Sequence, residues 1–147
     1  MQKMSYQKLI DFWGVDNLSR AKAEALKNIN ISEESKRFLI EIGLPRKLDL
    51  FYPIEFSLER DTLPKFEINK YLPKKLRQTY QIFKQPIIIA LEGDILGYIC
   101  ISELYESVGG YIYSVGIFRD RIDSIYFMNS SVLQLAEFFF LYQNYRF

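Results

Sequence analysis

The sequence has 147 residues, of which 49% are hydrophobic and 25% are charged, as in an ordinary soluble globular protein with a buried core. Its 19 basic and 18 acidic residues nearly cancel, which excludes a global attraction to nucleic acid or to an anionic membrane. Histidine is absent and Cys100 is the one cysteine, so Ser-His-Asp and Cys-His catalysis, Cys/His zinc sites and an internal disulfide are excluded. We expect one domain over residues 1–147, with no metal and no cofactor.

The first part of the chain is predicted to be helical. Residues 5–13 and the alanine-rich residues 18–29 favour two helices. A third helix begins after Ser32, whose side chain suits the N-cap position. It ends at Gly43, where a positive φ is tolerated, and Pro45 prevents its continuation.

Beyond Pro45 the pattern changes to that of strands. Residues 50–56 predict an irregular strand, which Pro53 places at an edge or a bulge. Residues 57–79 predict a loop with a short strand near residues 66–68. Further strands are predicted at residues 86–91, 95–102, 111–118 and 122–128, followed by a helix at residues 131–145. Helices, then an antiparallel meander, then a helix indicate an α+β fold.

Three small polar residues, Asn129, Ser130 and Ser131, stand between the last strand and the last helix. The N-x-S glycosylation pattern matters only in a secreted chain, and the N-terminus has no signal-peptide pattern. A serine nucleophile needs a base, and without histidine only a Ser-Lys pair stays open. We interpret the segment as a helix cap, in which Asn129 or Ser130 accepts a hydrogen bond from the first turn.

The last helix is apolar over a wider arc than burial of one side requires. Leu141 falls among the polar residues of its other side. Either the helix is buried on two sides within one chain, or one flank meets a partner, with a homodimer among the alternatives.

Two groups of charged residues are candidate chemical sites. The basic residues between Lys70 and Arg77 could grip phosphate, but the balanced net charge favours a solvated loop. Glu92 and Asp94 flank a glycine and could act as the carboxylate pair of a hydrolytic enzyme. Ordinary turn residues are the simpler interpretation of that pair.

Three segments together resemble the SUKH superfamily: FLIEIGLP at 38–45, PIIIALEGDILGYICI at 86–101 and IYFMNSSVLQLAEFFFLY at 125–142. The likeness is to the branch in which a helix ends in G-L-P and the last strand runs into N-S-S before a helix. It implies one α+β domain with a curved antiparallel sheet, N-terminal helices and a C-terminal helix. It also implies a non-enzymatic immunity protein that binds and neutralises a bacterial polymorphic toxin, often a nuclease or a nucleic-acid deaminase. Relatives with this fold also serve as regulatory interaction modules.

If the partner is a toxin domain, the candidate contacts are charged and aromatic residues in loops and at strand edges, where exposure is expected. Aromatic anchors can carry much of an interface's binding energy. The candidates are Glu55, Glu59, Asp61, Tyr105, Glu106 and Tyr111. We expect no direct contact with nucleic acid or membrane. The lack of a signal-peptide pattern and of a long apolar run favours the cytoplasm.

Overall fold

A computed structural model describes residues 5–49, 53–76, 86–92, 97–103, 110–119 and 121–145. The α-helices are α1 (Tyr6–Trp13), α2 (Ala23–Leu26), α3 (Glu33–Glu41), α4 (Ile68–Tyr71) and α5 (Val132–Asn144). The strands are β1 (Leu18–Ser19), β2 (Leu44–Pro45), β3 (Lys47–Asp49), β4 (Pro53–Phe56), β5 (Ile87–Glu92), β6 (Gly97–Ile101), β7 (Ile112–Phe118) and β8 (Arg121–Asn129). Short 3-10 turns follow α1 and α4, at Val15–Asn17 and Lys74–Leu76.

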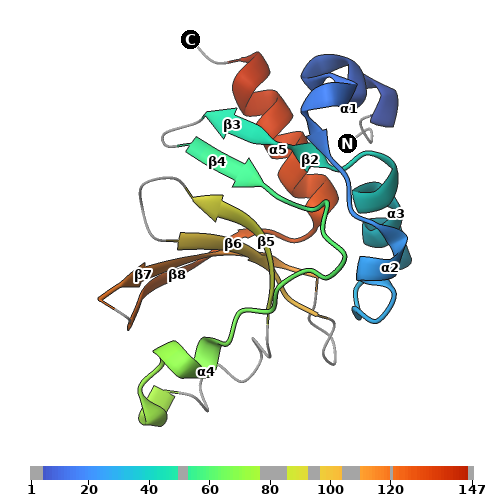
Figure 1. Ribbon diagram of the computed structural model, residues 1–147. Helices are drawn as coiled ribbons and strands as arrows, with labels where there is room; N and C mark the ends of the chain where they lie inside the picture. The colour runs from blue at the N-terminus through green and yellow to red at the C-terminus, as the bar shows by residue number, and fades with distance from the viewer. Residues whose placement is uncertain are drawn as a thin grey trace.

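The main sheet has six strands in the order β3-β4-β5-β6-β7-β8, each antiparallel to its neighbour. A separate pair joins β1 to β2. Figure 1 shows the main sheet twisting from β3 to β8, with α1, α2, α3 and α5 gathered on one side and α4 at the far end. The prediction of an α+β fold with an antiparallel sheet is confirmed.

Helix α5 lies between α1 and the sheet. The Phe139 ring packs against Phe56 of β4, with 5.9 Å between the ring centroids. The next residue, Phe140, meets Phe12 of α1 edge-on at 4.8 Å. At the far end of α5, the Trp13 Nε1–H of α1 donates to Gln143 Oε1 at 2.7 Å. Each of these contacts joins segments that are far apart in sequence, so α5 ties the helical layer to the sheet.

Helix α3 is bounded by the residues that the sequence singled out. Ser32 is its N-cap, and its hydroxyl oxygen accepts from the Ser35 N–H at 3.1 Å. Gly43 follows the helix with φ 81°, and its N–H donates to the Phe38 carbonyl at 2.9 Å. A Cβ at Gly43 would stand 2.0 Å from the carbonyl oxygen of Ser19. The G-L-P motif is therefore the turn that ends α3 and brings β2 against β1.

The cap of α5 is Ser131, so the prediction of Asn129 or Ser130 is wrong by one or two residues. The Ser131 hydroxyl oxygen accepts from the Gln134 N–H at 3.2 Å. Ser130 contributes its backbone N–H, which donates to Gln134 Oε1 at 3.1 Å. Asn129 is the last residue of β8 and pairs with Ile112. Asn129 is still paired within the sheet, and α5 begins only at Val132, with Ser131 as its N-cap.

The helix predicted for residues 18–29 is largely wrong. Leu18–Ser19 form strand β1, and only Ala23–Leu26 within that range are α-helical. The Ser19 side chain is buried, and its hydroxyl oxygen accepts from the Leu58 N–H at 2.8 Å. Tertiary contacts with β2 and with the segment after β4 thus override the local helix preference.

Two expectations for the middle of the chain also need correction. Pro53 lies in neither an edge strand nor a bulge: it is the first residue of β4, which runs between β3 and β5. A first residue can lack its N–H without breaking the strand. The short strand near 66–68 is replaced by a bridge between Lys65 and Ile87, after which Ile68 starts α4.

Candidate partner-binding surface

The main sheet has a second face, opposite α1, α3 and α5, which we call the open face. A smaller apolar cluster lies on it, separate from the main core. Its buried members are Phe66, Leu72, Cys100 and Val115, with Tyr71, Ile88, Tyr98, Ile117, Ile122 and Ile125 packed around them. The segment with α4 covers one part of this face, where the Phe66 ring stacks on Tyr71 at 5.3 Å and meets Tyr98 at 5.6 Å.

At the other end of β7 and β8, three aromatic side chains form a cluster that we call the aromatic trio: Tyr111, Tyr113 and Phe127. The Phe127 ring stands edge-on to Tyr111 at 5.7 Å and to Tyr113 at 5.9 Å. Phe127 is 57% exposed, although it belongs to a paired strand. Burial, with a smaller contribution from Tyr111, raises the pKa of the Tyr113 phenol above its ordinary value. The trio therefore presents a largely apolar surface, which suits an interface anchor.

Of the residues chosen from sequence, Tyr111 lies in the trio, whereas Tyr105 and Glu106 lie outside the described residues. Tyr113 and Phe127 are not among the contacts predicted from the sequence. The sequence signal for Tyr113 is its spacing of two residues from Tyr111 in YIYSV, and Phe127 stands in the strand segment IYF. Residues two apart in a strand share a face, so Tyr111 and Tyr113 lie on the same side.

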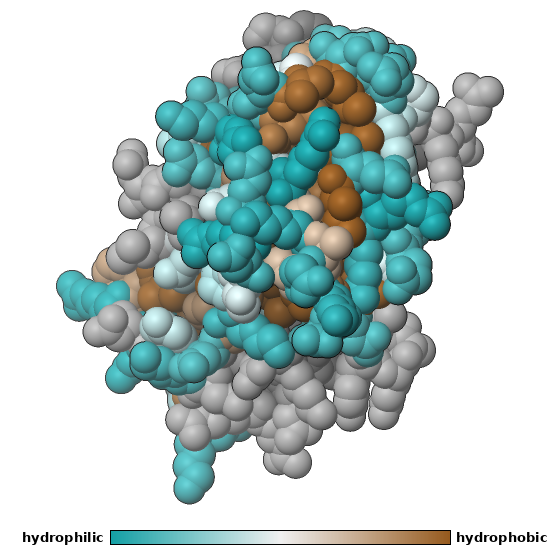
Figure 2. Space-filling model, turned by 45° about the vertical axis from the view of Figure 1, so that its right-hand side comes forward, coloured by the Kyte–Doolittle hydropathy of each residue, from teal (hydrophilic) through white to brown (hydrophobic). Residues whose placement is uncertain are grey.

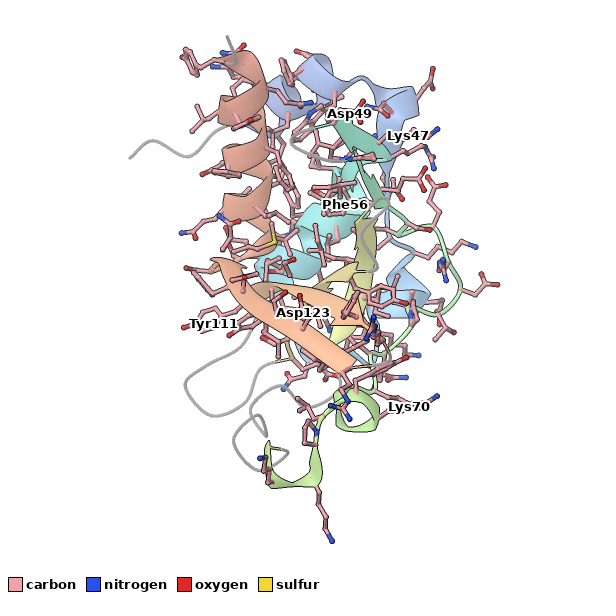
Figure 3. The ribbon with its side chains drawn as sticks, turned by 90° about the vertical axis from the view of Figure 1, so that its left-hand side faces the viewer. Lys47, Asp49, Phe56, Lys70, Tyr111 and Asp123 are labelled. Atoms are coloured by element: carbon pink, nitrogen blue, oxygen red, sulfur yellow. The ribbon has the colours of Figure 1, made fainter. Side chains whose placement is uncertain are left out.

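The acidic candidates lie elsewhere. Glu55 is exposed on β4, opposite Lys47 of β3, and β3 is separated from β7 by three strands. Figure 3 places Lys47 and Asp49 at one end of the molecule and Tyr111 well away from them. The structure thus does not bring the predicted acidic and aromatic residues into one compact patch.

Glu59 and Asp61 are both held in ion pairs. Arg46 donates to Glu59 through both terminal nitrogens, from Nη1 to Oε2 at 2.9 Å and from Nη2 to Oε1. Lys22 Nζ donates to Asp61 Oδ1 at 2.7 Å. These hydrogen bonds lower the pKa of each carboxyl group below its ordinary value. Their charge is therefore matched locally, and this loop is not a free acidic surface.

Helix α5 has one buried flank and one exposed flank. Val132, Leu135, Ala136, Phe139 and Phe140 are buried. Phe138 is 48% exposed and Leu141 is 44% exposed. Of the two alternatives that the sequence left open, burial on both sides does not hold in the single chain.

The structure adds no support for a carboxylate-pair enzyme or for a metal site among the described residues. Glu92 is the last residue of β5, and Asp94 lies outside the described residues. Within the described ranges, no three Cys, Asp or Glu side chains gather where they could hold a metal ion. A groove of about 470 Å³ lies between α2 and α3, on the largely hydrophilic side seen in Figure 2. Its charged lining is evenly mixed: Glu24, Lys27, Glu33, Lys36, Arg37 and Glu41.

None of the helices in the described parts of the chain is both long and apolar enough to cross a membrane. Within the aromatic trio, Phe127 is the exposed member, and Tyr111 and Tyr113 are partly buried. The family model of the SUKH-4 immunity proteins matches residues 4–147, so the chain belongs to that family. Searches of curated proteins and of solved structures give no match.

Proposed function

We propose that this protein is a non-enzymatic immunity protein, which binds and neutralises a cognate toxin of a bacterial polymorphic toxin system. The observation that carries the proposal is its membership of the SUKH-4 immunity protein family over residues 4–147. The toxin would be a nuclease or a nucleic-acid deaminase, and the protein would meet it in the cytoplasm. Inhibition follows from occupying the toxin's active site or from holding the toxin in an inactive conformation.

In this proposal, the aromatic trio is the anchor of the contact. Phe127 is the most exposed large side chain of the trio and lies between two tyrosines that hold its ring. Preformed, rigid aromatic groups lose little conformational entropy on binding. Tyr105 and Glu106 would be further contacts, and Glu55 would contribute from a separate part of the surface, on β4. Glu59 and Asp61 would contribute less, because each would have to exchange a partner within the chain.

The test uses the toxin domain encoded beside this gene and a matched pair of variants. Phe127→Ala removes the proposed anchor, and we expect it to weaken binding by about 30-fold or more, the size of an interface hot spot. Phe118→Ala is the control, because Phe118 is also an exposed aromatic residue, 61% accessible, but lies at the other end of β7. Calorimetry would give both affinities, and survival of cells that express the toxin would give protection.

Equal affinities for the two variants would show that the trio is not the anchor. No binding and no protection with any adjacent toxin would contradict the immunity role itself. A regulatory interaction module with the same fold would then be the better proposal, and a gene neighbourhood without a toxin would favour it.

A further inference from the structure

The two edges of the main sheet differ in a way that bears on self-association. Strand β3, at one edge, has three residues, and two of them are the exposed, charged Lys47 and Asp49. Short charged edges resist pairing with other strands. Strand β8, at the other edge, has nine residues and only two charges, Arg121 and Asp123. It is therefore the edge that offers a long row of backbone donors and acceptors.

Strand β8 is accessible on both faces of the sheet, and none of its residues is buried. Tyr126, which is 65% exposed, pairs with Ser114. The neighbouring Phe127 pairs with Tyr113, on the open face. In Figure 1 the β7–β8 hairpin projects away from α1, α3 and α5, so the helical layer leaves this edge uncovered.

Register shifts on the β7 side define a regular stretch within β8. Ser124 to Phe127 pair in sequence with β7, and a shift follows at each end. Met128 packs against the main core, so the alternation between faces continues to that residue. The regular stretch thus spans five residues, Ser124 to Met128, with Tyr126 at its centre.

We propose that β8 pairs antiparallel with β8 of a second copy. The two-fold axis that relates the copies is normal to the sheet and passes midway between the two Tyr126 residues. The opposed residues are then Tyr126 with Tyr126, Ile125 with Phe127, Ser124 with Met128 and Asp123 with Asn129. Aromatic and β-branched residues make favourable cross-strand pairs, and the carboxylate meets an amide. An axis one residue earlier, through Ile125, would instead set Asp123 against Phe127.

The pairing joins the two main sheets into one continuous sheet. Because the axis is normal to the sheet, both aromatic trios lie on the same side of the dimer. The contact is isologous, as in most homodimers. A strand pair of this length buries less than the roughly 1,000 Å² of a stable interface, so the dimer forms reversibly and depends on concentration.

Sedimentation equilibrium of the whole chain tests this proposal without any toxin, and its outcome does not depend on the proposed function. The wild-type mass is expected to rise with concentration from 17.5 kDa toward twice that value. Tyr126→Lys places two like charges opposite each other on the axis and should give a monomer, and so should Tyr126→Glu. An equimolar mixture of the two variants should recover the dimer, because Lys then faces Glu.

Phe118→Lys is the matched control, since it adds the same charge at an exposed aromatic position away from the axis and should leave the dimer intact. Circular dichroism of each variant establishes that it is folded. A wild-type chain that stays monomeric at every concentration overturns the proposal. A dimer that survives Tyr126→Lys overturns the use of this edge, and folded variants that fail to associate when mixed overturn the axis through Tyr126. If the wild type is monomeric and Tyr126→Lys weakens toxin binding, the edge belongs to the toxin and not to a second copy.

Discussion

Gly43 shows how strongly one residue can be constrained by both its own backbone and its neighbours. Its φ of 81° is unfavourable for any residue with a Cβ, and the Ser19 carbonyl leaves no room for one. We expect Gly43→Ala to lower the free energy of unfolding by about 3 kcal/mol or more, since strain and overlap act together. Urea unfolding followed by the fluorescence of Trp13 measures the loss.

Gly110→Ala separates these two causes. Gly110 also has a positive φ, 69°, but a Cβ there would meet nothing within 4 Å. Strain alone should cost about 1 kcal/mol. If the two substitutions destabilise the protein equally, the close approach of β1 to Gly43 contributes nothing.

The pair between Arg46 and Glu59 gives the stability a pH dependence whose sign can be worked out. The pKa of Glu59 in the folded protein lies below its ordinary value of 4.5. The contribution of the pair is therefore complete above that value and is lost as the pH falls through the folded pKa. We expect Glu59→Gln to be less stable than the wild type at neutral pH, and the difference to vanish in acid.

Thermal unfolding from neutral to acidic pH tests this expectation. Both side chains are about half exposed, so the effect should be small and should shrink as salt is added. In a chain that already carries Arg46→Gln, the Glu59 substitution should change little. A stability difference that persists below the folded pKa would rule out the pair as its cause.

At the scale of elements, the start of α5 shows how neighbouring residues with similar chemistry differ in role. Ser131 accepts from the first turn through its hydroxyl oxygen, whereas Ser130 acts through its backbone N–H. Ser131→Ala should lower the free energy of unfolding by about 1 kcal/mol, and Ser130→Ala should change it by only a few tenths. Chemical denaturation of the two variants measures both losses. A larger loss for Ser130→Ala than for Ser131→Ala would show that Ser130 is the cap.

Elements with strong local signals could be predicted from the sequence. Ser32 and Gly43 bound α3 through chemistry that is local to the chain, and the strands from β5 to β8 show clear apolar patterns. The two short strands Leu18–Ser19 and Lys47–Asp49 were beyond such reasoning. Each exists because a distant segment pairs with it, and the local sequence of the first favours a helix instead.

At the scale of the whole molecule, the two faces of the main sheet are covered to different extents. The helical layer buries one face, and the segment with α4 covers only part of the other. The sequence could single out Tyr111, which is partly buried in the trio. It could not predict the trio, because Phe127 reaches Tyr111 and Tyr113 only through the pairing of β7 with β8.

We propose that the protein neutralises a toxin by stoichiometric binding. Its most direct test is a titration of the neighbouring toxin's catalytic activity with the purified protein. Stoichiometric binding predicts that activity falls linearly to zero at a fixed molar ratio and returns when the complex is dissociated. Undiminished activity at excess protein, or full inactivation by a small fraction of an equivalent, would contradict it.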